Sequence, residues 1–291
     1  MPLVSIGLPV RNGASRIPDV VASVLAQDHH DLELVITDND STDETESVCR
    51  ELAAEEPRIS YYRHPENLGI LGNFQSAMRL AKGEFFRWVS DDDRLETYCV
   101  SRSLEVFAGA DRLILVTGQL AYTGEDGTTR SAVYEGTALR SDDPLERFTE
   151  MLRMLNSSHL LIDPLYGVFR RAAVVGIERR NMLREDEVFA TKLALAGPWG
   201  HVPEVLGQRH WKSETPSILA RRLQVPAWTA HAATTLQCRE VLRWLNTPEA
   251  GLTDAQRRRA RSAVREMWLR RQQAVATRRA RKLTRMVTNR A

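Results

Sequence analysis

Residues 85–96, FFRWVSDDDRLE, place three consecutive aspartates directly behind an apolar, aromatic run. The run predicts a buried strand, and the aspartates predict a loop at its end. Three adjacent carboxylates repel one another, so either water or a positive partner must offset the repulsion. Arg87 and Arg94 could neutralise them as surface ion pairs, or a bound cation could do so. The three aspartates are Asp91, Asp92 and Asp93.

Strand-like and helix-like segments alternate around this stretch. Continuous apolar runs predict strands, and apolar residues at helical spacing fill the intervals between them. The predicted strands lie at 3–10, 32–37, 58–63 and 84–90. Ser41 and Glu44 predict a capping box in front of the helix that follows the second strand. This alternation predicts an α/β fold with a doubly wound, mostly parallel central sheet and helices on both faces.

The rest of the chain is less regular. Strands are predicted at 112–122 and 164–171, and helices at 144–155 and 186–197. After residue 220 the pattern is almost entirely helical. The sequence therefore predicts one main domain over 1–220 and a helical, basic C-terminal extension over 221–291.

Composition narrows the class of protein. The 291 residues contain no apolar run of the roughly 20 residues that a membrane span requires. The first ten residues, MPLVSIGLPV, lack the layout of a signal peptide, so we expect a cytoplasmic protein. The three cysteines are widely spaced and form no CxxC motif, which argues against a thiolate zinc site.

Positive charge is concentrated towards the C-terminus. Residues 257–291 carry 13 of the 40 Lys and Arg residues and a single acid, Glu266, whereas the preceding residues have a balance of −10. A basic helix of this kind could lie on anionic lipid at the inner face of a membrane, grip a phosphorylated acceptor or cap the acidic body. No nucleic-acid recognition motif is present, so we expect no nucleic-acid partner.

Polar residues follow the first, second and fourth predicted strands, at 11–12, 38–40 and 91–93. In an open α/β sheet, ligands bind outside the carboxyl ends of the strands, so these three clusters should converge on one crevice. Carboxylate oxygens are ligands that Mg²⁺ and Mn²⁺ prefer, and a metal there would bring an anionic ligand with it. No GxGxxG or P-loop motif is present, which disfavours those two kinds of nucleotide site.

Five motifs occur in order over about residues 3–215: VSIGLPVRNGA, LELVITDNDSTDET, NLGILGNFQSAMRLAKGEFFRWVSDDD, YGVFRRAAV and REDEVF. Together they resemble the signatures of family 2 glycosyltransferases with the GT-A fold. The resemblance implies an inverting, metal-dependent transfer of a hexosyl or related sugar from a nucleoside-diphosphate sugar, most commonly UDP-linked, to a hydroxyl acceptor. That acceptor could be a saccharide, a lipid-linked molecule or a small natural product. The resemblance also divides the main domain into a nucleotide-sugar-binding half at 1–110 and an acceptor-side half at 111–220.

The resemblance assigns a nucleotide-sugar site to loops at the strand ends. Asp38 matches an acid near the uracil or ribose, and Asn39 stands where the family often has a second aspartate. The full set is Pro9, Val10, Arg11, Asn12, Asp38, Asn39, Asn67, Gly69, Asn73, Asp91 and Asp92.

The same resemblance places a divalent cation, Mn²⁺ or Mg²⁺, on the aspartate triplet. Either Asp91 and Asp93 form the metal-binding pair, or Asp91 faces the ribose while Asp92 takes the metal. In the segment GQRHWKSET, either His210 or Lys212 would face the metal. The metal set implied in this way is Asp91, Asp92, Asp93 and His210.

Glu185 and Asp186 match the acidic pair from which the family draws its catalytic base. Asp186 is the predicted base and Glu185 the substitute; alternatively, the pair only complements a helix dipole. His159 is a weaker candidate on the acceptor side, and Trp211 could stack on a sugar or pack in the core. Because water must be kept from the donor, we expect a mobile loop within 207–220.

Two other functions stay open on the residues alone. A nucleotidyltransferase on a similar α/β sheet would also carry an acidic metal site, although the loop PVRNGAS offers little Gly or basic character for a triphosphate. A non-catalytic binding protein could use the basic tail as its functional part.

Overall fold

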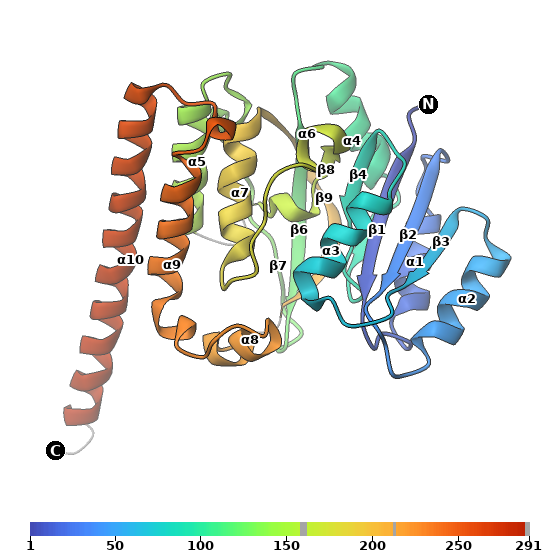
Figure 1. Cartoon of the computed structure of the whole chain (residues 1–291), viewed down its shortest axis with the longest axis horizontal. Coiled ribbons are helices and arrows are strands. Elements are labelled where there is room, and N and C mark those ends of the chain that lie inside the picture. The colour runs from blue at the N-terminus through green and yellow to red at the C-terminus, as the bar shows by residue number, and fades with distance from the viewer. Residues whose placement is uncertain (158–161, 212–213, 289–291) are drawn as a thin grey trace.

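A computed structural model describes residues 1–157, 162–211 and 214–288, with side chains as far as residue 277. Across these residues, one sheet runs in the order β3-β2-β1-β4-β8-β6-β9-β5, and β7 pairs with β6 outside this path (Figure 1). The strands are β1 (Val4–Val10), β2 (Leu32–Asp38), β3 (Ile59–Arg63), β4 (Phe85–Trp88), β5 (Arg94–Leu95), β6 (Leu115–Gly124), β7 (Thr129–Arg130), β8 (Val168–Arg170) and β9 (Trp199–Trp211).

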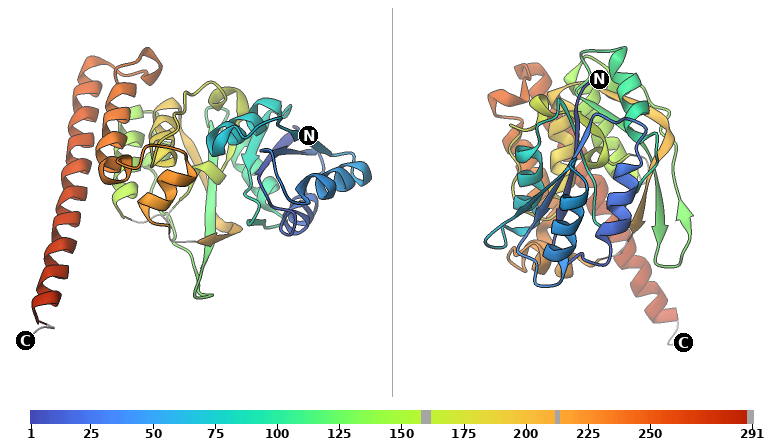
Figure 2. Two further views of the ribbon diagram at one scale, coloured as in Figure 1. Left: turned by 60° about the horizontal axis from the view of Figure 1, so that its bottom comes forward. Right: turned by 90° about the vertical axis from the view of Figure 1, so that its right-hand side faces the viewer.

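Helices cover both faces of this sheet, as the end-on view in Figure 2 shows. They are α1 (Ile17–Leu25), α2 (Thr45–Glu55), α3 (Gly69–Leu80), α4 (Cys99–Ala108), α5 (Pro144–Ser157), α6 (Arg171–Val174), α7 (Glu185–Ala196), α8 (Pro216–Arg222), α9 (Thr229–Trp244) and α10 (Asp254–Thr288). One apolar core lies between the sheet and the helices α1, α2 and α4, and a second lies between the sheet and α3, α5 and α7. The predicted α/β fold with two covered faces is confirmed.

The first half of the sheet is parallel, and the helices on its two faces bury β1, β2 and β4 almost completely. β1 pairs in parallel with β2 and β4, and β2 pairs in parallel with β3. Ile6 and Leu8 enter the core on the α1 side, whereas Gly7 faces α3. A Cβ at Gly7 would lie 2.6 Å from Cζ of Phe86 and 3.0 Å from Cβ of Ala77. Glycine therefore lets α3 approach the sheet closely.

The second half of the sheet is mixed. β8 runs antiparallel to both β4 and β6, β9 runs parallel to β6, and β5 runs antiparallel to β9. The segment predicted as a strand at 164–171 consists of the 3-10 turn Pro164–Tyr166 followed by β8. Helix α4 and strand β9 were not predicted. β9 contains Pro203, and its pairing with β6 shifts register after Gly118 and after Gln119, which disrupts the simple alternation expected of a strand.

Two local predictions change at the strand ends. β4 ends at Trp88, so the aspartate triplet lies in the turn that follows. The predicted capping box is wrong, because α2 begins at Thr45 with Glu44 at its N-cap position and no capping side chain. The hydroxyl of Ser41 donates instead to Oδ1 of Asp38, at 2.5 Å. The Ser41 oxygen accepts from the backbone N–H of Asn12, at 2.9 Å, so the acceptor that the capping box required binds another loop.

The C-terminal helices extend the body of the protein. α9 and α10 pack against α5 and α7 through a third apolar cluster that includes Phe148, Val241 and Val264. α10 then continues beyond the end of α9 and carries the C-terminus away from the body (Figure 1). Within the described ranges, no helix is both long enough and apolar enough to cross a membrane. The division of the chain at residue 220 stays a prediction.

Candidate active site

Hydrogen bonds join the loops that follow β1 and β2. Asn12 donates its backbone N–H to Oγ of Ser41 (2.9 Å), and its Oδ1 accepts from the backbone N–H of Thr42 (2.8 Å). Arg11 donates from Nε to the carbonyl of Asn39 (3.1 Å). Asn12 has a φ of 54°, a left-handed conformation that Asn adopts more readily than most residues. The first two polar clusters therefore converge, as the strand order predicts.

Asn39 extends this network to the start of α3. Its Nδ2 donates to Oδ1 of Asn67 (2.8 Å) and to the carbonyl of Gly69 (3.2 Å). Its Oδ1 accepts from the backbone N–H of Leu68 (2.7 Å). Both amide atoms of Asn39 are thus used to hold the loop in front of α3.

Asn73 ties α3 to the two central strands. Its Nδ2 donates to the carbonyls of Val10 (3.2 Å) and Thr37 (2.9 Å). Pro9 and Val10 are buried at the end of β1, so their backbone and the side chain of Asn73 form the floor of the loop cluster. Oδ1 of Asn73 is buried and has no hydrogen-bond partner among the described residues.

Asp38 lies beneath this cluster and is 0% exposed. Its Oδ1 accepts from the backbone N–H and the hydroxyl of Ser41, and its Oδ2 accepts from the hydroxyl of Tyr61 (2.7 Å) and from Arg63 (3.0 Å). Because all these donors belong to the protein, Asp38 organises the loops from within and does not present its carboxylate to solvent.

Two aspartates of the triplet pair with different arginines. Asp91 forms an ion pair with Arg16, which also donates to the carbonyl of Asn12 (3.1 Å). This contact joins the third polar cluster to the first. Neither Arg87 nor Arg94 forms an ion pair in the part of the chain that the structure describes, so the interpretation that they neutralise the triplet is wrong.

Asp93 is buried and pairs with Arg209 at 3.2 Å. The same guanidinium binds Asp163 (2.7 Å) and lies over the ring of Tyr166, 3.6 Å from its centroid. Burial raises the pKa of Asp93, and the charge of Arg209 offsets part of the rise. Arg209 therefore connects the triplet to the segment that precedes β8.

Asp92 and His210 are neighbours. Nδ1 of His210 lies 2.8 Å from the carbonyl oxygen of Asp92. A neutral imidazole that donates from Nδ1 leaves Nε2 available to a ligand. The carboxylate of Asp92 has no hydrogen-bond or ion-pair partner among the described residues. No group of three His, Cys, Asp or Glu side chains in those residues is arranged to hold a metal ion, so the four predicted ligands do not form a preassembled cage.

Asp186 lies in the first turn of α7. Its side chain still meets solvent, yet the surrounding protein desolvates it and raises the pKa of Asp186 to about 6. The negative charges of Glu187, Asp163 and Glu185 add to this rise. A carboxylate whose pKa lies near the working pH is suited to accept a proton.

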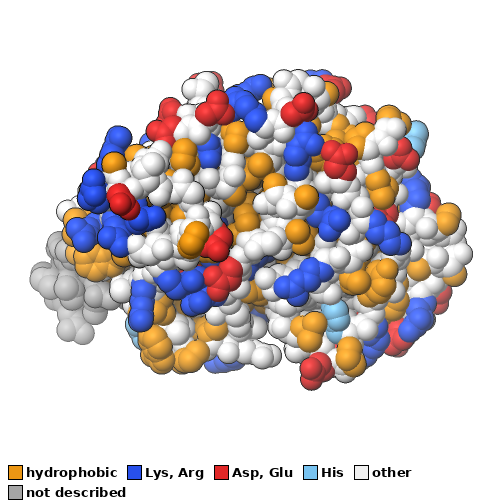
Figure 3. Space-filling view, turned by 45° about the horizontal axis from the view of Figure 1, so that its top comes forward, with side chains coloured by type: hydrophobic (Ala, Val, Ile, Leu, Met, Phe, Trp, Pro, Cys, Tyr) orange, Lys and Arg blue, Asp and Glu red, His pale blue; other side chains and the backbone are white. Residues whose placement is uncertain are grey.

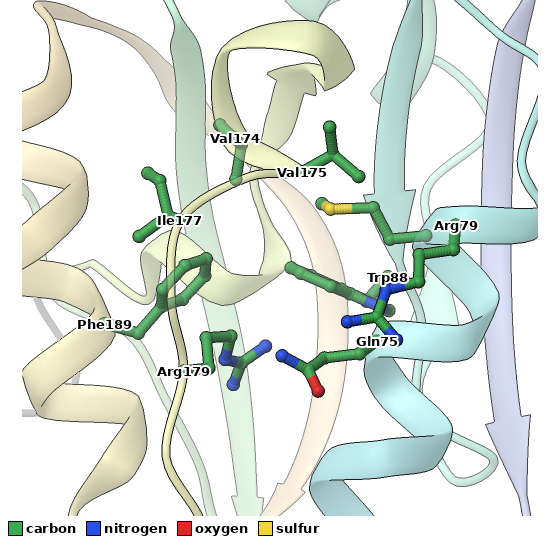
Figure 4. Close-up of a pocket in the computed structure, with 9 residues that line it drawn as sticks. Gln75, Arg79, Trp88, Val174, Val175, Ile177, Arg179 and Phe189 are labelled. Carbon is green, nitrogen blue, oxygen red and sulfur yellow. The ribbon is translucent and has the colours of Figure 1, made fainter. Parts of the chain in front are cut away.

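Glu185 has a different environment. Both of its oxygens accept from Arg179, at 2.7 Å and 2.5 Å. The guanidinium of Arg179 lies over the rings of Phe189 (4.2 Å) and Trp88 (5.4 Å) and points into a small cavity between α3 and α7 (Figure 4). Glu185 is therefore held in place, and Asp186 is the carboxylate of the pair that is open to a ligand.

Three further sequence predictions concern the end of β9. Trp211 is 43% exposed, with its ring 6.3 Å from that of Tyr122, so it does not pack in the core. Within 207–220, β9 extends to Trp211 and α8 begins at Pro216, and the mobile loop expected there stays a prediction. Lys212 and His159 lie outside the described residues.

The sequence profile described as "Glycosyl transferase family 2" matches residues 5–174, more than half of the chain. The chain belongs to this family. The matched region contains the loop cluster and the aspartate triplet, so the family profile covers both of these parts of the candidate site. Membership in a glycosyltransferase family argues against the two alternatives, a nucleotidyltransferase and a non-catalytic binding protein.

Two relatives illustrate the sequence similarity. The chain is 31% identical over 106 residues to the GalNAc(5)-diNAcBac-PP-undecaprenol beta-1,3-glucosyltransferase of Campylobacter jejuni, a match that covers 36% of this chain and 34% of that enzyme. It is 36% identical over 107 residues to the chondroitin synthase of Escherichia coli, covering 37% of this chain and 16% of the synthase. The matched segment thus spans about a third or less of these relatives.

Solved structures confirm the GT-A fold. S. aureus TarS, residues 1–349, superposes with a TM-score of 0.64 at 17% identity and covers 91% of this chain and 71% of its own. TarS in complex with UDP-GlcNAc gives 0.64 at 16% identity, with 91% and 72% covered. The mannosyltransferase PcManGT of Pyrobaculum calidifontis, in complex with GDP-Man and Mn²⁺, gives 0.53 at 17% identity, with 92% and 85% covered.

Sequence reasoning missed the arginines that fix the acidic residues of this glycosyltransferase. They are Arg16, Arg179 and Arg209, which pair with Asp91, Glu185 and Asp93 respectively. Each lies in or close to a quoted motif, but nearly all basic residues of the chain are arginines. Residue type alone therefore does not separate these three from the arginines of the surface.

Proposed function

We propose that this enzyme moves a sugar from a UDP-sugar to a hydroxyl acceptor in one inverting step, with Asp186 as the general base. The different environments of Asp186 and Glu185 carry the proposal, because only Asp186 combines an open carboxylate with a raised pKa. Binding of UDP-GlcNAc by TarS, which has the same fold, supports the choice of donor.

The loop cluster at the ends of β1 and β2 would hold the nucleotide. Arg11 and Asn12 lie at its exposed rim, whereas Asp38, Asn39 and Asn73 are buried and shape it from beneath. Gly69, with φ 75°, has open space where a Cβ would lie and admits a ligand close to the backbone. The proposed nucleotide-sugar site also includes Pro9, Val10, Asn67 and Asp91.

The proposed reaction is a single displacement at the anomeric carbon of the donor sugar. The acceptor oxygen forms a bond to that carbon while the bond to the diphosphate oxygen breaks on the opposite face, so one displacement inverts the configuration. Asp186 accepts the proton that the acceptor hydroxyl loses. Because the base must be ionised, activity should decline as the pH falls below about 6.

A divalent cation fits Asp92 and His210. The carboxylate of Asp92 is free of protein partners among the described residues, and the hydrogen bond at Nδ1 of His210 leaves its other ring nitrogen available. When bound there, Mn²⁺ or Mg²⁺ would neutralise charge on the departing diphosphate. This choice favours the register in which Asp91 faces the ribose, while Asp93 is held by Arg209. The Mn²⁺ complex of PcManGT supports a cation in an enzyme of this fold.

We further propose that the acceptor is lipid-linked and is used at an anionic membrane surface. The name of the C. jejuni relative specifies an undecaprenol diphosphate substrate. Basic side chains gather at the end of the molecule that carries α10 (Figure 3). Those exposed on the described part of α10 include Arg258, Arg259 and Arg265.

Thermal shift tests the donor and the metal together. UDP, GDP and dTDP are each titrated with and without MnCl₂, and stabilisation by UDP that requires Mn²⁺ is expected. Asp92→Asn and His210→Ala should lose the Mn²⁺-dependent increment, whereas Asp111→Asn, at a fully exposed position, should keep it. Equal stabilisation by UDP in wild type with and without Mn²⁺ would rule out the metal site. No response to any nucleotide would rule out the donor.

A further inference from the structure

Glu187 follows the proposed base in sequence, and the protein holds both of its oxygens. Oε1 accepts from Nη1 of Arg184. Oε2 accepts from Nε2 of Gln237 at 3.0 Å and from Nη2 of Arg271 at 2.6 Å. Arg184 precedes α7 directly, Gln237 lies on α9, and Arg271 lies on α10. Two residues far along the chain therefore act on the turn that carries Asp186.

Arg271 uses each nitrogen of its guanidinium. Nε donates to Oδ1 of Asn156 (3.0 Å), Nη1 donates to Oε1 of Gln237 (2.8 Å), and Nη2 donates to the carbonyl of Leu155 (2.7 Å) as well as to Glu187. The side chain of Arg271 is only 14% exposed. The helices α5, α7, α9 and α10 thus meet at one largely buried cation.

The backbone in front of Asp186 needs such support. Arg184 has a φ of 62°, a left-handed conformation that is rare for a residue of its kind and costs about 1 kcal/mol or more. The ion pair between Arg184 and Glu187 spans the turn on either side of Asp186. A contact that fixes Glu187 therefore fixes the direction in which the Asp186 carboxylate leaves α7.

We propose that Arg271 is a positioning residue for the general base, so that the C-terminal helix is a working part of the sugar-transfer site. The inference rests on the proposed role of Asp186. Through Glu187, Arg271 holds the first turn of α7 in the geometry that proton transfer requires. The positive charge of Arg271 also offsets the negative charge of Glu187 next to the base.

The neighbouring Arg270 supplies a matched control. It lies on the same helix, its side chain is 59% exposed, and it pairs with Glu266 one turn earlier within α10. Arg271→Gln and Arg270→Gln remove the same charge from adjacent positions, but only the first breaks the contact with Glu187. Arg271→Lys retains the positive charge but loses the planar guanidinium whose three nitrogens donate to different partners.

Steady-state kinetics with a soluble acceptor test the proposal. Arg271→Gln should lower kcat by at least about tenfold with little change in the KM for the donor, because a misplaced base slows the chemical step and not donor binding. Arg271→Lys should recover part of kcat, and Arg270→Gln should match wild type. Equal kinetics for the 270 and 271 variants would overturn the proposal.

A pH profile separates positioning from a role in folding alone. The charged groups that face Asp186 are Glu187, Glu185 and Asp163, and Arg184 and Arg271 pair with the first of these. Arg271→Gln should move the acidic limb of kcat/KM to higher pH, because Glu187 keeps its charge and loses a counter-ion. Glu187→Gln should move the limb to lower pH.

If Arg271→Gln folds poorly, Glu187→Gln still tests the proposal, because the direction in which its acidic limb moves can be measured independently. An unmoved limb in Glu187→Gln would sink the inference. Asp186→Asn identifies the source of a failure. If that variant retains activity, the assignment of the base is wrong; if it is inactive while the 271 and 187 variants behave as wild type, only the role of Arg271 is wrong.

Discussion

At the scale of single residues, the arginine partner decides what a carboxylate can do. Glu185 and Asp186 are adjacent, but Glu185 is neutralised by a buried, bidentate contact with Arg179. Asp186 is instead desolvated by the surrounding protein and faces the negative charge of Glu187 and Asp163, and both effects raise its affinity for a proton. Two neighbouring acids of one helix turn thereby acquire different chemistry.

Asp186→Asn should lower kcat by about 10²- to 10⁴-fold with a nearly unchanged donor KM, because it removes proton acceptance alone. Wild-type activity should fall as the pH drops below about 6. Because desolvation by the surrounding protein raises the pKa of Asp186 above its unfolded value, its ionised form destabilises the fold, and this effect disappears as the pH falls. Glu185→Gln should lose stability but retain an acidic limb, moved to slightly lower pH, because the charge of Glu185 adds to the raised pKa of Asp186. Wild-type rates in Asp186→Asn would refute the assignment.

Asp38→Ala should lower the free energy of unfolding by about 3 kcal/mol, because it leaves Tyr61, Arg63 and Ser41 without a buried acceptor. Asp40→Asn is the control, since Asp40 is partly exposed, contacts Arg63 at 3.3 Å and has a left-handed φ of 58° that Asn tolerates. It should change stability by under about 1 kcal/mol. Urea denaturation measures both. Equal losses would show that Asp38 does not hold the loop cluster together.

At the scale of elements, the two halves of the sheet differ in how far the sequence predicts them. The strands β1, β2 and β4 are short apolar runs buried on both faces, so their composition identifies them, whereas β3 at the sheet edge is only partly buried. β9 was missed because Pro203 and the register shifts opposite Gly118 interrupt its pattern. A bulged strand depends on its partner, and a partner distant in sequence is invisible to local periodicity.

The candidate site divides in the same way. Convergence of the loops after β1, β2 and β4 follows from strand order, so the sequence predicted it correctly. The ion pairs of Arg16 and Arg209 join residues 75 and 116 positions apart, and neither contact follows from local sequence. The burial of Asp38 also depends on Tyr61 and Arg63 in the next strand. Tertiary partners thus decide which polar residues remain open to a ligand.

The pairing of β6 with β9 gives a prediction at this scale. A Cβ at Gly118 would lie 2.4 Å from two carbons of Leu206, so Gly118→Ala should overpack the junction and cost about 1–3 kcal/mol. Gly109→Ala is the control, because its Cβ would meet nothing within 4 Å and its φ of −92° suits alanine. Unfolding in urea checks both. A neutral Gly118→Ala would show that β9 can move away from β6.

At the scale of the whole molecule, the charge of the chain is divided between the body and α10. Arg271 forms an ion pair with Glu187 inside the protein, whereas Arg258, Arg259 and Arg265 face solvent. The two proposals together give α10 two tasks: its packed residues would support the head of α7, and its remaining basic residues would contact an anionic surface.

Glutamine at five basic positions near the C-terminus should weaken binding to phosphatidylserine-containing vesicles by at least about tenfold, since each basic residue near such a surface contributes about 1 kcal/mol. The positions are Arg278, Arg279, Arg281, Lys282 and Arg285. Co-sedimentation measures binding, which should also weaken in high salt as the Debye length falls to about 3 Å at 1 M. Turnover of a soluble acceptor should persist, because these positions follow the residues of α10 that pack on the body.

The control carries the same loss of charge on the body, at Arg50, Arg130, Arg140, Arg180 and Arg239, all of which are exposed. If net charge alone drives binding, both variants should lose affinity equally. If the end of α10 is the contact, only the first should lose it, and its turnover of a lipid-linked acceptor in vesicles should fall in parallel. Equal loss in the two variants would mean that α10 serves the enzyme through Arg271 and the core, and not as a membrane contact.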